Sequence, residues 1–223
     1  MPAERELAER FNVSRPSLRS AIAILQKEGL LISKAGAGEF VADVLGSAFS
    51  PALVELFARH PEAVFDYLSF RRDMEGLAAE RAVQLASNTD LQVVSTVLEK
   101  MEVAHTKRNT EEEAKLDAQF HMAIIEASHN MVMLHMMRSM YQLLREGVFY
   151  NRQVMFKQRT TRGMLLDQHR AINNALQQRD ATKARAAVEA HLDYVQVCLR
   201  NEGRAAEKEA VARLRLDHVA SKS

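Results

Sequence analysis

The sequence is poor in the residues and segments that mark several classes of protein. Its 223 residues include one cysteine, no tryptophan, four prolines and eight glycines. The lone Cys198 excludes a disulfide scaffold and a zinc finger built on cysteines. No apolar run approaches the ~20 residues that span a bilayer, and the N-terminal stretch has no signal- or transit-peptide pattern. We therefore expect a cytoplasmic protein with no membrane partner.

The charges also lack an excess of one sign. Thirty Lys and Arg residues face 29 Asp and Glu residues, for a net charge of +1. This balance excludes a uniformly basic nucleic-acid binder and an acidic solvating tail, although a local basic surface remains possible. Ala, Leu, Arg, Glu, Gln and Met dominate, and these are strong helix formers. With 47% hydrophobic residues, the chain is expected to be mostly helical around a buried core.

Residues 1–42 have a pattern of their own. Two helices are predicted, and Ser14 is a good N-cap for the second, which is expected to end at Gly29. Apolar side chains mark both helices: Leu7, Ala8, Phe11, Leu18, Ala21, Ile22 and Leu25. Two β-prone stretches follow, at 30–33 and 39–41, on either side of a glycine-containing loop. Helix, tight turn, helix and hairpin is the order of a winged helix-turn-helix.

The rest of the chain reads as consecutive helices. The predicted spans are 62–86, 89–107, 111–128, 130–146, 148–157, 161–178 and 181–202. Thr110 and Glu113 are predicted to form a capping box at the start of one of them. Residues 43–61 are expected to be a linker, and 204–223 a charged tail. The predicted fold is therefore mainly α, with a winged helix-turn-helix followed by an all-α bundle over 62–203.

Two arginines in the second predicted helix are candidates for reading DNA. Arg15 and Arg19 are four residues apart and share a face in its first turns, the part of a recognition helix that enters the major groove. Ser14 and Ser17 can add phosphate or base contacts there. An arginine fork can bond guanine O6 and N7 together. The alternative is that these arginines, with Arg5, are ordinary surface charges.

The stretch PAERELAERFNVSRPSLRSAIAILQKEGLL resembles the winged helix-turn-helix of the GntR family of bacterial transcription regulators. The resemblance implies that Arg5, Arg15 and Arg19 contact operator DNA, and that the wing glycine Gly36 approaches the minor groove. Family members usually carry another helix before this point. The first helix of the winged domain is therefore expected to be absent, which would expose part of the small core and weaken DNA binding.

Four polar side chains fall on helix faces that are otherwise apolar. Asp117 and His121 are one turn apart on the 111–128 helix, while His169 and His191 lie in apolar stripes on the next two long helices. Because burying an unpaired polar group is costly, they are either separately satisfied core residues or one shared site. An Asp and three neutral His suit Zn²⁺, Ni²⁺ or Mn²⁺. An octahedral ion would keep two positions for a 2-hydroxy or 2-keto carboxylate.

Arg71 or Arg72 is the candidate clamp for the carboxylate of such an acid. Arg71 shares a helix face with Met74 and Ala78, so it leans toward the apolar side. The alternative is an ion pair with Glu75 within the helix.

Residues 62–200 resemble the FCD ligand-binding domain of the FadR subfamily of GntR regulators. The matching pieces are FRRDMEGLAAERA, DAQFHMAIIEASHN, DQHRAI and EAHLDYV. The resemblance implies that Asp117, His121, His169 and His191 are metal ligands and that Arg71 lies near the effector. The pieces HPEAVFDYL and ASHNMVMLHMMRSM are most similar to members that control pyruvate, lactate or glycolate metabolism.

The sequence thus predicts a transcriptional regulator, a repressor or an activator, and not an enzyme. Its operator binding is expected to respond to a small organic acid bound at a divalent metal. Two copies should form a homodimer, because palindromic double-stranded operators match two-fold dimers. Two alternatives stay open: a metal-dependent enzyme acting on a small organic acid, and a sensor that has lost DNA binding.

Overall fold

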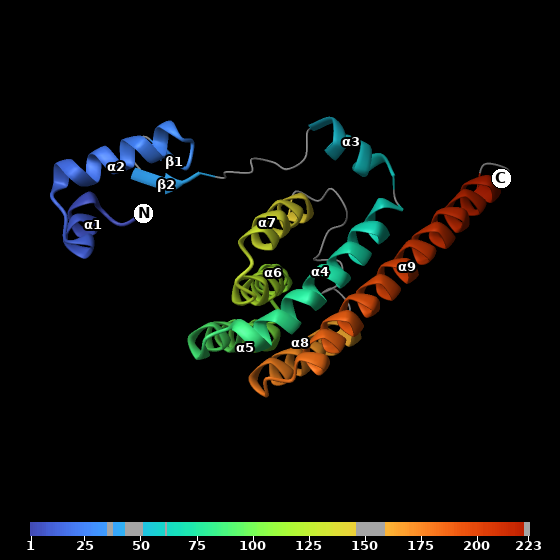
Figure 1. Ribbon diagram of the computed structural model, residues 1–223. Helices are drawn as coiled ribbons and strands as arrows, with labels where there is room; N and C mark the ends of the chain where they lie inside the picture. The colour runs from blue at the N-terminus through green and yellow to red at the C-terminus, as the bar shows by residue number, and fades with distance from the viewer. Residues whose placement is uncertain (35–37, 43–50, 61, 146–158, 221–223) are drawn as a thin grey trace. The chain divides into compact units, whose positions relative to one another are not determined.

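The computed structural model describes residues 1–34, 38–42, 51–60, 62–145 and 159–220 (Figure 1). Contacts within the chain divide it into two units, Met1–Ala48 and Phe49–Ser223. Each unit has its own hydrophobic core.

The first unit is two helices and a hairpin: α1 (Glu4–Phe11), α2 (Arg15–Lys27), β1 (Leu31–Lys34) and β2 (Gly38–Val41). The strands pair antiparallel, with Leu31 opposite Val41. Ser14 caps α2 as predicted, since its Oγ accepts a hydrogen bond from the Ser17 amide at 3.3 Å. Gly29 follows α2 at a φ of +73°, a left-handed conformation that glycine adopts without strain. The predicted winged helix-turn-helix is confirmed.

The core of this unit is small, consisting of Leu7, Ala8, Leu18, Ile22 and Leu31. Three residues of the predicted apolar faces are not buried: Phe11 is 62% exposed, Leu25 is 37% exposed, and Ala21 is exposed as well. All three sit on helix faces that no described element of the unit covers. Helical spacing alone does not show which apolar position meets a partner.

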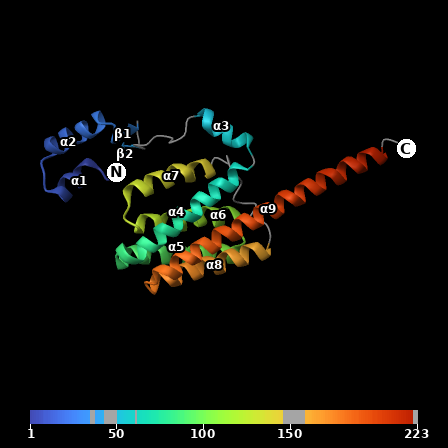
Figure 2. The ribbon, with the colours of Figure 1, turned by 45° about the vertical axis from the view of Figure 1, so that its right-hand side comes forward.

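The second unit is helical throughout its described residues. Its helices are α3 (Pro51–Arg59), α4 (Ala63–Leu85), α5 (Asn88–Lys107), α6 (Thr110–Ala127), α7 (Met131–Arg145), α8 (Arg159–Gln177) and α9 (Ala181–Ala220). α4 and α9 run side by side in both views (Figures 1 and 2), and α5 packs on α6 and α8. This bundle holds the large core.

Two helix boundaries differ from prediction, and one predicted helix cannot be compared. α3 lies within the expected linker, where the periodicity is weak. α9 continues to Ala220, although the helix was expected to end at residue 202 and a charged tail to begin at residue 204. That extension is rich in Ala, Glu, Lys, Arg and Leu, whose helix propensity is high, and Arg213 pairs with Glu209 one turn away at 3.0 Å. The predicted helix 148–157 lies outside the described residues.

The helix caps correct one sequence prediction. Asn109, and not Thr110, caps α6, because its side chain accepts from the Glu112 amide at 3.1 Å. The side chain of Glu113 is therefore free of the predicted capping box and is buried. At the start of α5, Ser87 and Asp90 form a reciprocal capping box that the sequence analysis missed.

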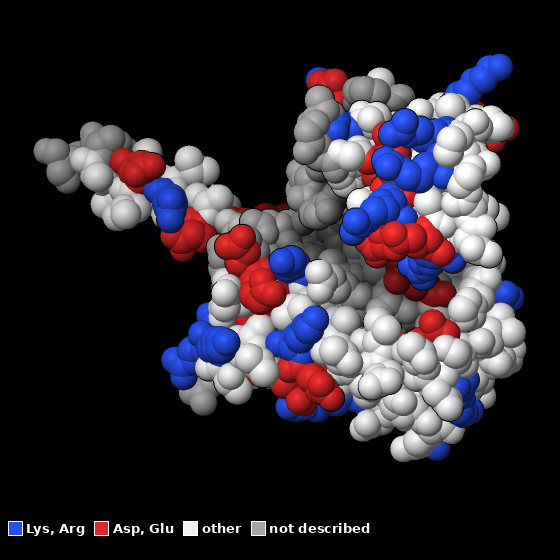
Figure 3. Space-filling model, turned by 90° about the vertical axis from the view of Figure 1, so that its left-hand side faces the viewer, with Lys and Arg blue, Asp and Glu red and all other residues white. Residues whose placement is uncertain are grey.

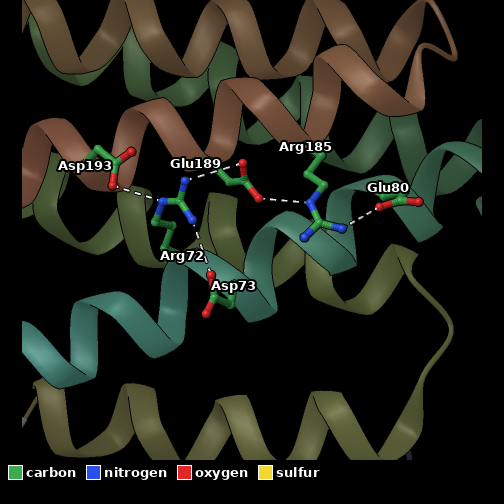
Figure 4. A network of polar contacts seen from close by, with 6 residues as sticks. All are labelled: Arg72, Asp73, Glu80, Arg185, Glu189 and Asp193. Carbon is green, nitrogen blue, oxygen red and sulfur yellow. Dashed lines mark hydrogen bonds and ion pairs between the residues drawn. The ribbon is translucent and has the colours of Figure 1, made fainter.

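A network of ion pairs joins α4 to α9 (Figure 4). Arg72 donates to Asp193 at 2.9 Å. Arg185 donates to Glu189 on its own helix and to Glu80 on α4, each at 2.9 Å. These pairs are partly exposed, so each contributes little by itself. Together they connect the two helices that flank the site described below.

Gly76 allows these helices to come close. A Cβ at this position would lie 3.2 Å from Cγ of Glu189 on α9. Because the two helices pack closely here, α4 and α9 can both contribute side chains to the interior of the bundle.

The surface carries both signs of charge. Lys and Arg lie among Asp and Glu over the described part of the face in Figure 3, without a large region of one sign. No described helix is long and apolar enough to cross a membrane.

Candidate metal centre and DNA-binding face

The four predicted metal ligands meet inside the bundle. α6 supplies Asp117 and His121, α8 supplies His169, and α9 supplies His191. One ligand atom from each lies within 4.8 Å of all the others. All four side chains are buried. The sequence left two interpretations open, separately satisfied core residues or one shared site. In the structure the four residues form one cluster.

The contacts within the cluster are short. Nε2 of His169 lies 3.1 Å from Oδ1 of Asp117 and 3.4 Å from Nε2 of His121. Nε2 of His121 lies 3.8 Å from the same Asp117 oxygen. Two imidazole nitrogens and a carboxylate oxygen thus converge on one point, as donors around a cation do.

Outer residues contact two of the histidines. Nδ1 of His121 lies 2.7 Å from Oε2 of Glu75. Nδ1 of His191 lies 3.0 Å from Oε1 of Gln168. Partners of this kind fix the orientation of metal-binding imidazoles. Sequence reasoning missed both roles, although Gln168 directly precedes a predicted ligand.

Burial keeps two of the imidazoles in the form that binds metal. Burial lowers the pKa of His121, against the opposing effect of Glu75. Burial lowers the pKa of His191 well below its ordinary value, and the neighbouring His169 and His121 lower it further. Both rings are therefore neutral at pH 7, with a lone pair to offer. Buried neutral imidazoles beside a carboxylate fit a borderline divalent ion such as Zn²⁺, Ni²⁺ or Mn²⁺.

Arg71 is buried beside this cluster and is fully engaged. It donates to Glu75 at 2.6 Å and to the Tyr141 hydroxyl at 2.6 Å, while that hydroxyl donates to Glu75 at 2.9 Å. Burial alone would raise the pKa of Glu75, but Arg71 and His121 hold it below its usual range. The ion pair with Glu75, one of the two alternatives for Arg71, is present. Arg72 instead joins the network between α4 and α9.

In the first unit, two predicted DNA contacts share an acidic partner. Arg19 donates from Nε to Oε2 of Glu4 at 2.9 Å, and Nη2 of Arg15 lies 3.9 Å from the same oxygen. Both arginines are exposed on the first turns of α2. Glu4 on α1 thus holds the two guanidinium groups near each other. The sequence analysis did not single out Glu4.

The remaining predicted DNA contacts are placed less tightly. Arg5 is exposed and lies 3.9 Å from Glu9. The hydroxyls of Ser14 and Ser17 bond to each other at 2.8 Å on the exposed start of α2. Gly36 lies outside the described residues.

Comparisons with known proteins agree with this architecture. The family model for bacterial regulatory proteins of the gntR family matches residues 1–41, and the FCD domain model matches residues 66–194. An Escherichia coli protein described as an L-lactate dehydrogenase operon regulatory protein is 34% identical over 90% of this chain and 78% of its own. The Glc operon transcriptional activator of Escherichia coli is 31% identical over 87% and 78%.

A solved structure shares the fold. The GntR protein of Streptococcus agalactiae superimposes with a TM-score of 0.55 over 87% of each chain, at 21% identity. The two domain models together cover most of the chain, in the order that the structure shows. The chain therefore belongs to the GntR family of bacterial regulatory proteins, with an FCD domain after its winged helix-turn-helix, and is a DNA-binding regulator of transcription.

Proposed function

We propose that this regulator binds an operator through its first unit and releases or engages it in response to a small organic acid bound at a divalent metal in its second unit. The buried Asp117, His121, His169 and His191 cluster carries the proposal. Three buried imidazoles and one carboxylate make a donor set without a purely structural explanation, because packing is served as well by apolar side chains. The relatives that regulate lactate and Glc operons support a 2-hydroxy or 2-keto carboxylate as the effector.

The chain's own residues divide the work. The four cluster residues would hold the ion, which when bound offers free coordination positions to a carboxylate and an adjacent oxygen. Glu75 and Gln168 orient two of the imidazoles. Arg71 lies beside the cluster, bonded to Glu75, and would exchange part of that bond for the carboxylate of an incoming acid.

The first unit would read DNA. Arg15 and Arg19 point from the first turns of α2, where a recognition helix meets base edges, and Arg5, Ser14, Ser17 and Gly36 are the proposed further contacts. We assign DNA binding to 1–42, the connection to 43–61, and metal and effector binding to 62–203. The residues after 203 continue α9. A homodimer in the cytoplasm would present two recognition helices to a palindromic site.

One experiment separates the two halves of this proposal. Fluorescence anisotropy would follow binding to DNA from upstream of the protein's own gene, with nonspecific competitor and with lactate, glycolate or pyruvate. We expect His169→Ala to lose bound metal, measured by elemental analysis, and the response to acid, while DNA affinity without acid is kept. The matched control is His60→Ala, an exposed histidine outside the cluster. Unchanged metal content in the His169 variant would contradict the site assignment.

A further inference from the structure

One buried carboxylate connects the proposed acid clamp to a proposed metal ligand. Oε1 of Glu75 accepts hydrogen bonds from Arg71 at 2.6 Å and from the Tyr141 hydroxyl at 2.9 Å. Its other oxygen, Oε2, lies 2.7 Å from Nδ1 of His121. Glu75, Arg71 and His121 are all almost fully buried. The two oxygens of a single side chain therefore serve two different parts of the site.

The pairing with Glu75 keeps the charge of Arg71 neutralised while no acid is bound. A buried guanidinium that loses its anion is strongly destabilising. Arg71 therefore needs an anionic partner at all times, and Glu75, one turn along the same helix, provides it. Burial raises the pKa of Glu75, but Arg71 and His121 lower it by more, so this carboxyl group is an anion at pH 7. An acid that binds Arg71 has to take the place of a carboxylate that is already there.

The same side chain supports the metal ligand His121. A carboxylate beside the second nitrogen of a metal-binding imidazole fixes its tautomer and raises its basicity. In the structure, Glu75 divides its negative charge between this imidazole and Arg71. When Arg71 turns to the carboxylate of an acid, more of that charge acts on His121. The imidazole then becomes a stronger ligand for the metal.

We infer that Glu75 occupies Arg71 in place of the effector's carboxylate, that an acid displaces it there in order to bind, and that the displaced Glu75 then strengthens His121 as a metal ligand. The inference rests on the metal and acid site proposed above. It assigns to one residue opposite effects on two ligands. Glu75 lowers the affinity for the acid and raises the affinity for the metal, whereas a residue that only maintained the packing would support both.

Glu75→Gln separates these effects, because glutamine keeps the size of the side chain and loses its charge. The Zn²⁺ affinity, measured by competition with a chromogenic chelator, should fall by about 10- to 100-fold, the usual effect of losing an outer partner. The affinity for glycolate and L-lactate, measured by calorimetry on protein saturated with Zn²⁺, should rise by about 10-fold or more. The acid then no longer competes for a hydrogen bond between charged groups.

The control is Asp73→Asn, which removes a carboxylate from an exposed position on the same helix, where it pairs with Arg72. It should leave both affinities unchanged. In the Glu75 variant, an acid affinity that stays the same or falls, or a Zn²⁺ affinity that stays the same, would overturn the inference. If the wild-type protein binds neither Zn²⁺ nor other divalent ions, the proposed metal site itself is wrong. That result is distinct from metal binding that is indifferent to Glu75.

A second measurement uses the wild-type protein and does not depend on the variant folding. In proton–nitrogen-15 NMR of the Zn²⁺-loaded protein, glycolate should move the Nδ1 proton of His121 to lower field, as a shorter and stronger hydrogen bond to Glu75 does. The Nδ1 proton of His191, which faces the uncharged Gln168, is the internal control and should move less. A His121 proton that stays in place or moves to higher field would contradict the displacement of Glu75 from Arg71.

Discussion

At the residue scale, Glu4 contacts two of the arginines that we propose as DNA contacts. Its carboxylate lies between Arg15 and Arg19, so the two guanidinium groups are held near each other before DNA arrives. If these arginines contact DNA as proposed, the Glu4 carboxylate would also repel the phosphates of any DNA. We therefore expect Glu4 to lower affinity for DNA in general, while it favours sequences that suit the fixed arginines.

Glu4→Gln should accordingly tighten binding to random duplex DNA and lower the ratio of the affinity for operator DNA to the affinity for random DNA. The change should be fivefold or less, since an exposed ion pair is worth ~0–1 kcal/mol. Anisotropy titrations at two salt concentrations would measure both affinities. Glu6→Gln removes the same charge from an exposed position on α1 and should keep the ratio. Equal effects of the two variants would show that Glu4 acts by charge alone.

At the element scale, capping decides where the helices of the bundle begin. The Ser87 amide and hydroxyl donate to Oδ2 of Asp90 at 2.8 Å and 2.7 Å, and the Asp90 amide donates to Oγ of Ser87 at 3.1 Å. The hydrogen bonds from Ser87 lower the pKa of Asp90. Nε2 of His129 lies 3.1 Å from the same oxygen, so the start of α5 is tied to the end of α6.

Ser87→Ala should lower the free energy of unfolding at pH 7 by ~0.5–2 kcal/mol, the usual value of an N-cap. Because the folded pKa of Asp90 lies below its unfolded value, its contribution is present above that unfolded value, near ~4, and is lost as the pH falls through the folded pKa. The difference between wild type and variant should therefore shrink below pH ~4. Urea unfolding, followed by circular dichroism at several pH values, measures this difference in unfolding free energy. Thr96→Ala, exposed in the middle of α5, should show no such trend.

The sequence predicted most of the helices and the four residues of the buried cluster. The contacts that it did not predict were missed for physical reasons. His169 and His191 could be predicted because a polar residue in an apolar stripe of one helix is visible without the fold. Glu75 could not be assigned to His121, because that contact depends on how α4 packs on α6. Glu113 was placed in a capping box for a similar reason, since its buried partner Arg162 is 49 residues away. The prediction that Phe11 is buried was wrong, because the spacing of apolar residues along a helix does not show whether another element covers that face.

At the scale of the whole molecule, the two units differ in what stabilises them. The core of the first consists of five side chains, whereas the second buries a large cluster spread over most of its helices. A small core leaves a small margin of stability. All the proposed metal ligands lie in the second unit, so metal binding should stabilise that unit and not the first.

Calorimetry should therefore show two transitions, with the first unit unfolding at the lower temperature. Saturating Zn²⁺ should raise only the upper transition, by a free energy of ~2.7 kcal/mol when the free ion is at 100 times its Kd. Asp117→Asn should abolish that shift and leave the lower transition in place. A single transition that moves as a whole with Zn²⁺ would show that the two units unfold together.

The length of α9 has a mechanical consequence. His191 lies in the first third of a helix that ends at Ala220 and is exposed from residue 203 onward, and at 1.5 Å per residue the stretch from His191 to Ala220 measures roughly 44 Å. A tilt of ~5° about the imidazole would carry the far end through about 4 Å over that length. A small change of tilt at His191 thus becomes a displacement of several ångströms at Ala220.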